Sequence, residues 1–329
     1  MINKEKNIQI LFFEEIKKSL VSKFTFVDEI SDLLNVSQDA AYRRIRGEKL
    51  INLEETFVLS KHFGISLDSF VGITENNKIQ CKYTPLDLSD INNYCKYLQT
   101  ISENLNRIKS VPESEIIMTA SDIPIFHFYM FNELTFFKLF SWNKSVYGYK
   151  KTFEEFVDDF KTDDVLKFYK KISSNYQLIP STEIWTENSI DLLLKSIEYS
   201  YKIGCFKDKR TVLTLCEQLF DIMNKIKDWA ENGTKCSKDI QYKLFINETN
   251  IDNTFILLKQ YEKISCSIKL YTINSLSTSD ERFCKETYTW LNNVIQQSTL
   301  ISGTSAKERY KFFEDQKRKI SLLMESCNV

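Results

Sequence analysis

The side chains best suited to recognition chemistry gather near the start of the chain, between residues 37 and 49. Arginine and glutamine donate hydrogen bonds to base edges in the DNA major groove, and arginine and lysine also bind phosphates. If a helix begins after Ser37, Ala41 and Ile45 point inward and polar side chains point outward. The residues predicted to contact a duplex are Ser37, Gln38, Asp39, Tyr42, Arg43, Arg44, Arg46 and Lys49.

Two helices and a tight turn are needed to present this set. Upstream of it, Val27, Ile30 and Leu34 recur at helical spacing. Asn35 follows, and asparagine tolerates the left-handed backbone that such a turn requires. Val36 then fills the corner between the helices, and Ser37 is a good N-cap for the second one. The stretch from residue 26 to residue 47 therefore predicts a helix-turn-helix.

Further helices are predicted on both sides of this motif. They are Ile8–Leu20, Asn52–Phe63 closed by Gly64, and a short last turn at Ser66–Phe70. The phrases NVSQDAAYRRIRGEKLINLEE and LSKHFGISLDSF resemble the lambda-repressor-like (Cro/C1, XRE) class over about the first seventy residues. The resemblance implies five helices around the motif. It also implies that the loop around Glu48 and Lys49 lies along the DNA backbone. The residues that it implies face the major groove are Ser37, Gln38, Asp39, Tyr42, Arg43 and Arg46.

Length and charge constrain the number of domains and the kind of nucleic-acid binding. A chain of 329 residues suggests about two domains, and a hydrophobic fraction of 43% can fill sizeable cores. The net charge of −1 excludes a general nucleic-acid coat protein. Within residues 1–72, positive charge gathers at Arg43 to Lys49, which predicts a narrow binding stripe, doubled by dimerisation, with a modest dependence on salt.

A break in the helical pattern predicts the domain boundary. Polar residues and Pro85 interrupt it, so we expect a DNA-binding domain over residues 1–72, a linker over 73–86 and a regulatory or dimerisation domain over 87–329. The next helical pattern, Leu86–Ile108, fits a spacer, a dimer contact or a surface helix of the second domain.

The most apolar segment of the chain runs from Pro124 to Trp142. Charged residues such as Glu133 and Lys138 interrupt it, and their burial in lipid costs roughly 2.5 to 3.5 kcal/mol each. We therefore predict a helix buried in the second domain, not a membrane span. A cavity beside it could take a small apolar or aromatic effector, although core packing explains the same side chains: Phe126, Tyr129, Phe136, Phe140 and Trp142.

The rest of the second domain is predicted to be mostly helical with a small sheet. Helical patterns cover Phe153–Phe160, Asp163–Asn175, Glu187–Ile203, Lys207–Trp229, Asp280–Gln297 and Ala306–Met324. Strand patterns cover Ser114–Ala120, Tyr242–Ile246, Phe255–Tyr261 and Ser267–Ile273. The predicted fold class is mainly α: a five-helix head, followed by an α+β domain in which helix predominates and the last three strands form a small antiparallel sheet.

Catalytic signals are missing from the sequence. Seven glycines form no phosphate-binding loop, and His62 and His127 lack metal-ligand spacing. Carboxylates such as Asp163 and Asp164 fit helix ends. The eight cysteines are scattered, and the first ten residues contain no apolar run of signal-peptide length, which indicates reduced thiols in the cytoplasm. We expect no enzyme, no cofactor and no metal site.

These observations predict a cytoplasmic, dimeric transcriptional regulator of the helix-turn-helix class that binds double-stranded DNA. Its second domain would dimerise or sense a small molecule or peptide, without membrane contact. Two alternatives stay open. The helix-turn-helix could dock a protein instead of DNA, and the second domain could hold a reaction of its own.

Overall fold

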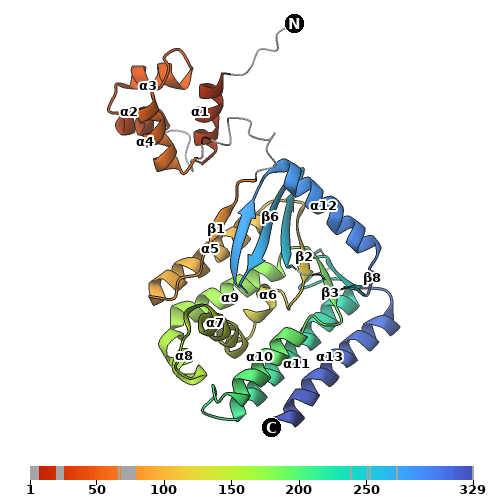
Figure 1. Cartoon of the computed structure of the whole chain (residues 1–329). Helices are drawn as coiled ribbons and strands as arrows, with labels where there is room; N and C mark the ends of the chain where they lie inside the picture. The colour runs from red at the N-terminus through yellow and green to blue at the C-terminus, as the bar shows by residue number, and fades with distance from the viewer. Residues whose placement is uncertain are drawn as a thin grey trace. The chain divides into compact units, whose positions relative to one another are not determined.

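The computed structural model describes residues 7–19, 26–65, 67, 79–237, 239–249, 251, 253–271 and 273–327. The chain forms two compact units, Met1–Gln80 and Cys81–Val329. Figure 1 labels the helices and strands of both. Each unit contains a hydrophobic core of its own, so each is described by itself.

The described part of the N-terminal unit consists of helices. They are α1 (Ile8–Ser19), α2 (Phe26–Leu34), α3 (Gln38–Ile45) and α4 (Leu53–Phe63). These bounds confirm the helices predicted around residues 8–20, in the helix-turn-helix and over residues 52–63. The predicted last turn, Ser66–Phe70, lies outside the described residues except for Leu67.

Local chemistry explains the turn between α2 and α3. Asn35 adopts a left-handed conformation with φ of 51°, as predicted for the residue that reverses the chain. The Ser37 hydroxyl then accepts a hydrogen bond from the Ala40 backbone N–H at 3.3 Å, which satisfies one free donor of the first helical turn. Ala41 is completely buried in a core with Phe13 of α1 and Ile30 of α2.

The C-terminal unit is organised around one eight-stranded sheet in the order β1-β7-β6-β5-β2-β3-β4-β8. The β2, β3 and β4 strands run parallel, and every other neighbouring pair is antiparallel. The strands are β1 (Lys82–Thr84), β2 (Ser114–Ala120), β3 (Ser181–Thr186), β4 (Tyr242–Asn247), β5 (Phe255–Gln260), β6 (Lys263–Leu270), β7 (Asn274–Thr278) and β8 (Thr299–Leu300).

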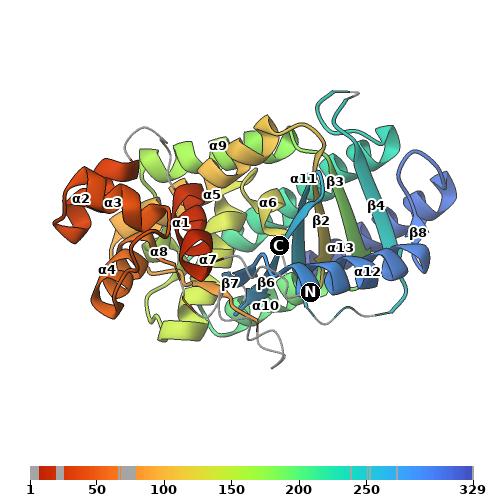
Figure 2. The same cartoon turned by 90° about the horizontal axis from the view of Figure 1, so that it is seen from above.

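Helices cover both faces of this sheet. On one face, Ile117 and Ile184 pack with Leu291 of α12 (Glu281–Gln296), which runs across the strands in Figure 2. On the other face, Met118 and Leu244 belong to the main core, shared with the remaining helices. These are α5 (Ile91–Ser110), α6 (Ile125–Phe128), α7 (Asn132–Tyr147), α8 (Phe153–Phe160), α9 (Asp163–Gln177), α10 (Asp191–Lys202), α11 (Arg210–Asn232) and α13 (Ala306–Ser326).

This architecture contradicts the predicted fold class. We expected a mainly α protein, with a five-helix head and a small antiparallel sheet in a mostly helical domain. The structure is instead an α/β protein, in which an extensive mixed sheet with a parallel centre organises the second unit. The predicted strand Ser114–Ala120 is confirmed, but it lies at the centre of this sheet, and residues 82–84, assigned to the linker, form β1.

Four strands of the sheet, β1, β3, β7 and β8, are absent from the sequence prediction, and all six residues of β3 are buried. In its sequence, STEIWT, polar and apolar residues do not alternate, and the apolar residues do not recur at helical spacing. Strands in the parallel centre of a sheet are covered on both faces, so their sequences need not alternate. Polar residues such as Thr182 and Glu183 are retained because they find hydrogen-bond partners inside the protein.

The predicted buried helix Pro124–Trp142 is divided in two. The α6 helix ends at Phe128, and α7 begins at Asn132 and continues to Tyr147. In the first turn of α7, the Thr135 hydroxyl is within hydrogen-bond distance of the carbonyls of Phe128 and Phe131, which ties the start of α7 to the end of α6. No helix in the described ranges has the length and apolar character that a bilayer crossing requires.

The helical pattern after the domain boundary belongs to the second unit. In α5, Tyr94, Leu98 and Leu105 are buried in the main core, and the Tyr94 hydroxyl is hydrogen-bonded to that of Tyr169 in α9 at 2.7 Å. Of the three interpretations left open for this segment, the structure therefore shows a helix packed on the second unit.

Candidate nucleic-acid interface

The outward face of α3 carries an exposed basic and aromatic surface. Tyr42 is 47% exposed, and the side chains of Arg43 and Arg46 are 56% and 60% exposed. The Arg46 guanidinium lies 4.6 Å from the centre of the Tyr42 ring, a cation–π contact that restricts the arginine while leaving its donors available. Lys49, in the loop after α3, is exposed as well. We call Tyr42, Arg43, Arg46 and Lys49 the basic face.

The N-terminal residues of α3 have mixed roles. Ser37 caps the helix, and the Gln38 side chain donates to Asp28 of α2 at 2.5 Å. Asp39 is exposed in the first turn of α3, where a negative charge interacts favourably with the helix dipole. Of these three side chains, that of Gln38 is the one that can pair with a base edge through two hydrogen bonds, and it would first have to leave Asp28.

Arg44 does not belong to this surface, which corrects its inclusion among the predicted contacts. Its side chain is only 6% exposed. The guanidinium donates to the Glu55 carboxylate through Nε at 3.1 Å and Nη2 at 2.6 Å, and to the Ala40 carbonyl through Nη1 at 3.2 Å. Arg44 therefore joins α3 to α4 and has no donor directed at a phosphate.

A buried glutamine fixes the end of α3 against α1. The Gln9 amide nitrogen donates to the carbonyl oxygens of Arg44 at 2.6 Å and Lys49 at 2.8 Å, and its oxygen accepts from the Ile51 N–H at 3.0 Å. One side chain thus satisfies the Arg44 carbonyl in the last turn of α3 and two backbone groups of the loop that follows. Sequence reasoning missed Gln9, because nothing local marks a polar residue on α1 as buried.

One acidic residue partly offsets the charge of the basic face. The Glu48 carboxylate lies 3.9 Å from Arg43 Nε and 3.7 Å from Arg46 Nη1. All three side chains are at least half exposed, and ion pairs of this kind contribute about 0 to 1 kcal/mol. Glu48 therefore does not prevent Arg43 and Arg46 from binding an anionic partner.

With this geometry defined, the chain was compared with known proteins. No protein-family model, curated protein or solved structure matches it. The resemblance to the lambda-repressor-like class therefore stays a prediction.

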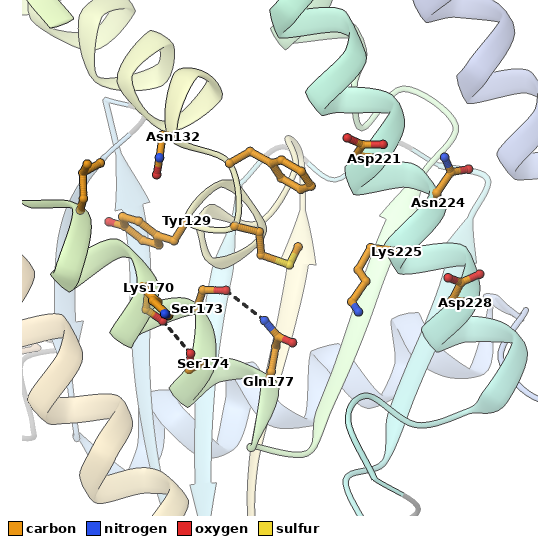
Figure 3. Close-up of a pocket in the computed structure, with 13 residues that line it drawn as sticks. Tyr129, Asn132, Lys170, Ser173, Ser174, Gln177, Asp221, Asn224, Lys225 and Asp228 are labelled. Carbon is orange, nitrogen blue, oxygen red and sulfur yellow. Dashed lines mark hydrogen bonds between the residues drawn. The ribbon is translucent and has the colours of Figure 1, made fainter. Parts of the chain in front are cut away.

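The aromatic residues considered for lining an effector cavity all belong to the main core. Phe136, Phe140 and Trp142 of α7 are at most 1% exposed and pack in the main core, together with Phe126. Tyr129, in the turn after α6, lines a cavity that has a volume of about 780 Å³ and opens between α9 and α11 (Figure 3). Core packing therefore accounts for the rest of the set.

The most unusual chemistry of the second unit is a buried carboxylate. Glu183 of β3 is fully buried, and its oxygens are 2.9 Å from His127 Nε2. They also accept hydrogen bonds from Trp185 Nε1 at 2.8 Å and the Tyr242 hydroxyl at 3.2 Å, as well as from Tyr176. These residues form the Glu183 cluster. In the described part of the chain, no group of three or more histidine, cysteine or acidic side chains is arranged to hold a metal ion.

A buried lysine borders the Glu183 cluster. Lys235 Nζ donates to the carbonyls of Tyr176 at 3.1 Å and Ile179 at 2.9 Å, and it lies 3.5 Å from the centre of the Tyr176 ring. Burial lowers the pKa of Lys235 to about 7, although the nearby Glu183 carboxylate opposes this effect. A buried ammonium therefore titrates near neutral pH.

This titration predicts how stability changes with pH. Between pH 7 and pH 10.5, the unfolded chain binds a proton at Lys235 that the folded chain releases, so the free energy of unfolding should rise with pH over this range. The Lys235→Met variant should show a smaller rise in urea titrations at several pH values. Lys269, whose pKa burial lowers to about 8, should supply part of the remaining rise, whereas the exposed-site variant Lys243→Met should match the wild type. An unchanged slope in Lys235→Met would contradict the assignment.

Proposed function

We propose that this protein is a sequence-specific, DNA-binding transcriptional regulator that acts in the cytoplasm as a dimer. In this proposal, α3 is the recognition helix and enters the major groove through the basic face. The second unit provides dimerisation, sensing or both. The observation that carries the proposal is that the neighbouring arginines differ in exposure. Arg44 is buried in an ion pair, whereas Arg43 and Arg46 are exposed to solvent.

The construction of the N-terminal unit supports this role. Reading bases requires side chains on a backbone that keeps its position, because a small displacement breaks paired hydrogen bonds. The Ser37 cap, the Arg44–Glu55 ion pair and the Gln9 contacts hold both ends of α3. Arg43 and Arg46 therefore extend from a helix whose two ends are fixed. The cation–π contact with the Tyr42 ring restricts the Arg46 guanidinium further.

The proposal is tested by selection from a randomised duplex library with the full-length protein, followed by titration of the selected duplex. Arg43→Ala and Arg46→Ala should each weaken binding by about 1 to 3 kcal/mol if the side chain reads a base. Arg318→Ala is the matched control, because it removes an equally exposed arginine from α13. Failure to enrich any duplex, or equal affinity of all three variants and the wild type, would contradict the recognition-helix assignment.

A second candidate function has an observation of its own. Leu50, Leu53 and Phe57 in and before α4 are 74%, 80% and 63% exposed, and apolar side chains exposed together often mark protein contacts. The N-terminal unit could therefore dock a protein instead of DNA. Salt separates the two candidates: binding through phosphates weakens steeply as salt rises, whereas apolar docking does not.

A further inference from the structure

The cavity of about 780 Å³ in the second unit combines polar walls with an apolar floor. One wall is α9, which contributes Lys170 and Gln177, and the other is α11. In Figure 3 these walls face each other, with residues of the α6–α7 turn between them. That turn supplies Met130 and Phe131 to the lining. The volume falls within the range of about 300 to 1,000 Å³ that is typical of ligand sites.

Charges of both signs line this cavity without pairing. Lys170, Lys225, Asp221 and Asp228 all border it, yet within the described ranges none of the four takes part in an ion pair. Figure 3 shows Lys225 extending from α11 toward the opposite wall, and its ammonium lies 5.9 Å from the Trp229 ring centre. Two cations and two anions in one concave site suit a ligand that carries both charges.

The uncharged groups suit an amide ligand. Asn132 and Asn224 each line the cavity with a carboxamide from a different helix, and the carboxamide of Gln177 on α9 is hydrogen-bonded to Ser173 and Cys236. A carboxamide both donates and accepts, as a peptide group does. Met130, Phe131 and Leu166 provide apolar surface between these groups. Such a lining can pair the backbone of a peptide and bury one or more of its side chains.

The length of the walls limits the size of the ligand. Lys170 to Gln177 and Asp221 to Asp228 each span seven residues of helix, or about 10 Å at 1.5 Å per residue. An extended peptide advances about 3.3 Å per residue, so roughly three residues lie along the walls. The free ends of such a peptide carry the two charges that the walls can pair.

We propose that this cavity binds a short peptide of about three or four residues with both termini free. Its ammonium end pairs with aspartate on α11, and its carboxylate end pairs with both Lys170 and Lys225. The site lies entirely in the second unit, so binding does not require that the N-terminal unit recognise DNA. If the protein is a regulator, this cavity is where the second unit senses its signal.

The test uses the full-length protein and two peptide libraries. One contains randomised tri- and tetrapeptides with free ends, and the other contains the same sequences acetylated and amidated. Affinity selection followed by mass spectrometry should retain members of the free-ended library only. A retained peptide, measured by calorimetry, should bind Lys225→Met and Asp221→Asn at least about tenfold more weakly, a loss of roughly 1.4 kcal/mol.

A matched pair of variants on α9 controls for charge. Lys170 and Lys171 are adjacent and both exposed, but only Lys170 lines the cavity, because successive residues point in different directions around a helix. Lys170→Met should weaken binding, and Lys171→Met should not. Retention of neither library, equal retention of both, or equal affinity in all four variants would overturn the proposal. Because duplex binding is measured separately, either proposal can fail without the other.

Discussion

Arg44→Met should destabilise the N-terminal unit by roughly 3 kcal/mol, the lower end of the range for breaking a buried ion pair. Arg44 and Glu55 are 6% and 15% exposed, so the variant leaves a nearly buried carboxylate without its main donor. The Ala40 carbonyl also loses a hydrogen bond. Hydrogen exchange of the full-length chain, followed by mass spectrometry of peptides from α2 to α4, measures this loss where it occurs.

The neighbouring residue provides the control. Arg43→Met removes the same charge from an exposed position and should change stability by less than about 0.5 kcal/mol. Its effect should appear in DNA affinity instead. If both variants exchange hydrogen at the wild-type rate, the Arg44–Glu55 pair does not support the unit.

The same pair has a pH signature. Hydrogen bonding from Arg44 lowers the pKa of Glu55 below its usual 4.5. Its stabilising contribution is therefore complete above the pKa of the unfolded chain and is lost as pH falls through the lower pKa of the folded state. In Arg44→Met this part of the acid sensitivity should disappear from the exchange profile of α3 and α4.

Glu183→Gln is the second substitution with a large expected effect, a loss of roughly 3 to 5 kcal/mol in the unfolding of the second unit. The carboxylate accepts from Tyr176, Trp185 and Tyr242 while facing His127. A carboxamide offers one acceptor oxygen and turns an NH₂ group toward donors. Buried donors are then left without partners, and the negative charge that faces His127 and Lys235 is removed. Urea titration followed by tryptophan fluorescence measures the change.

Glu187→Gln is the matched control, because this glutamate lies four residues further along the chain and is exposed. It should unfold as the wild type does, to within about 0.5 kcal/mol.

Burial alone would raise the pKa of Glu183, but His127 and the hydrogen bonds outweigh it and hold the pKa at about 2. The carboxylate therefore stabilises the fold above pH 4.5 and progressively loses this effect toward pH 2. Glu183→Gln should lose that acid-dependent step, and a variant as stable as the control would refute the role of the cluster.

Helical periodicity alone predicts which side chains of the candidate interface are exposed. It places Tyr42, Arg43 and Arg46 outward, and the structure exposes them. The same periodicity contains the signal that was overlooked for Arg44, which follows buried Ala41 by three residues and so shares its face. Glu55, three residues after the N-cap Asn52, is its partner on α4. The pairing could not be read from either segment, because it joins residues eleven positions apart across a turn.

The sequence by itself determined the local elements of this protein: the turn at Asn35, the cap at Ser37, the helices of the N-terminal unit and the strand at residues 114–120. Each depends on backbone preferences and on contacts within a few residues. Only the tertiary structure decided the strand order, the burial of Glu183 and the meeting of α9 with α11 at a charged cavity. These features arise from pairing between distant segments, and a buried parallel strand such as β3 carries no alternation by which its neighbours could be inferred.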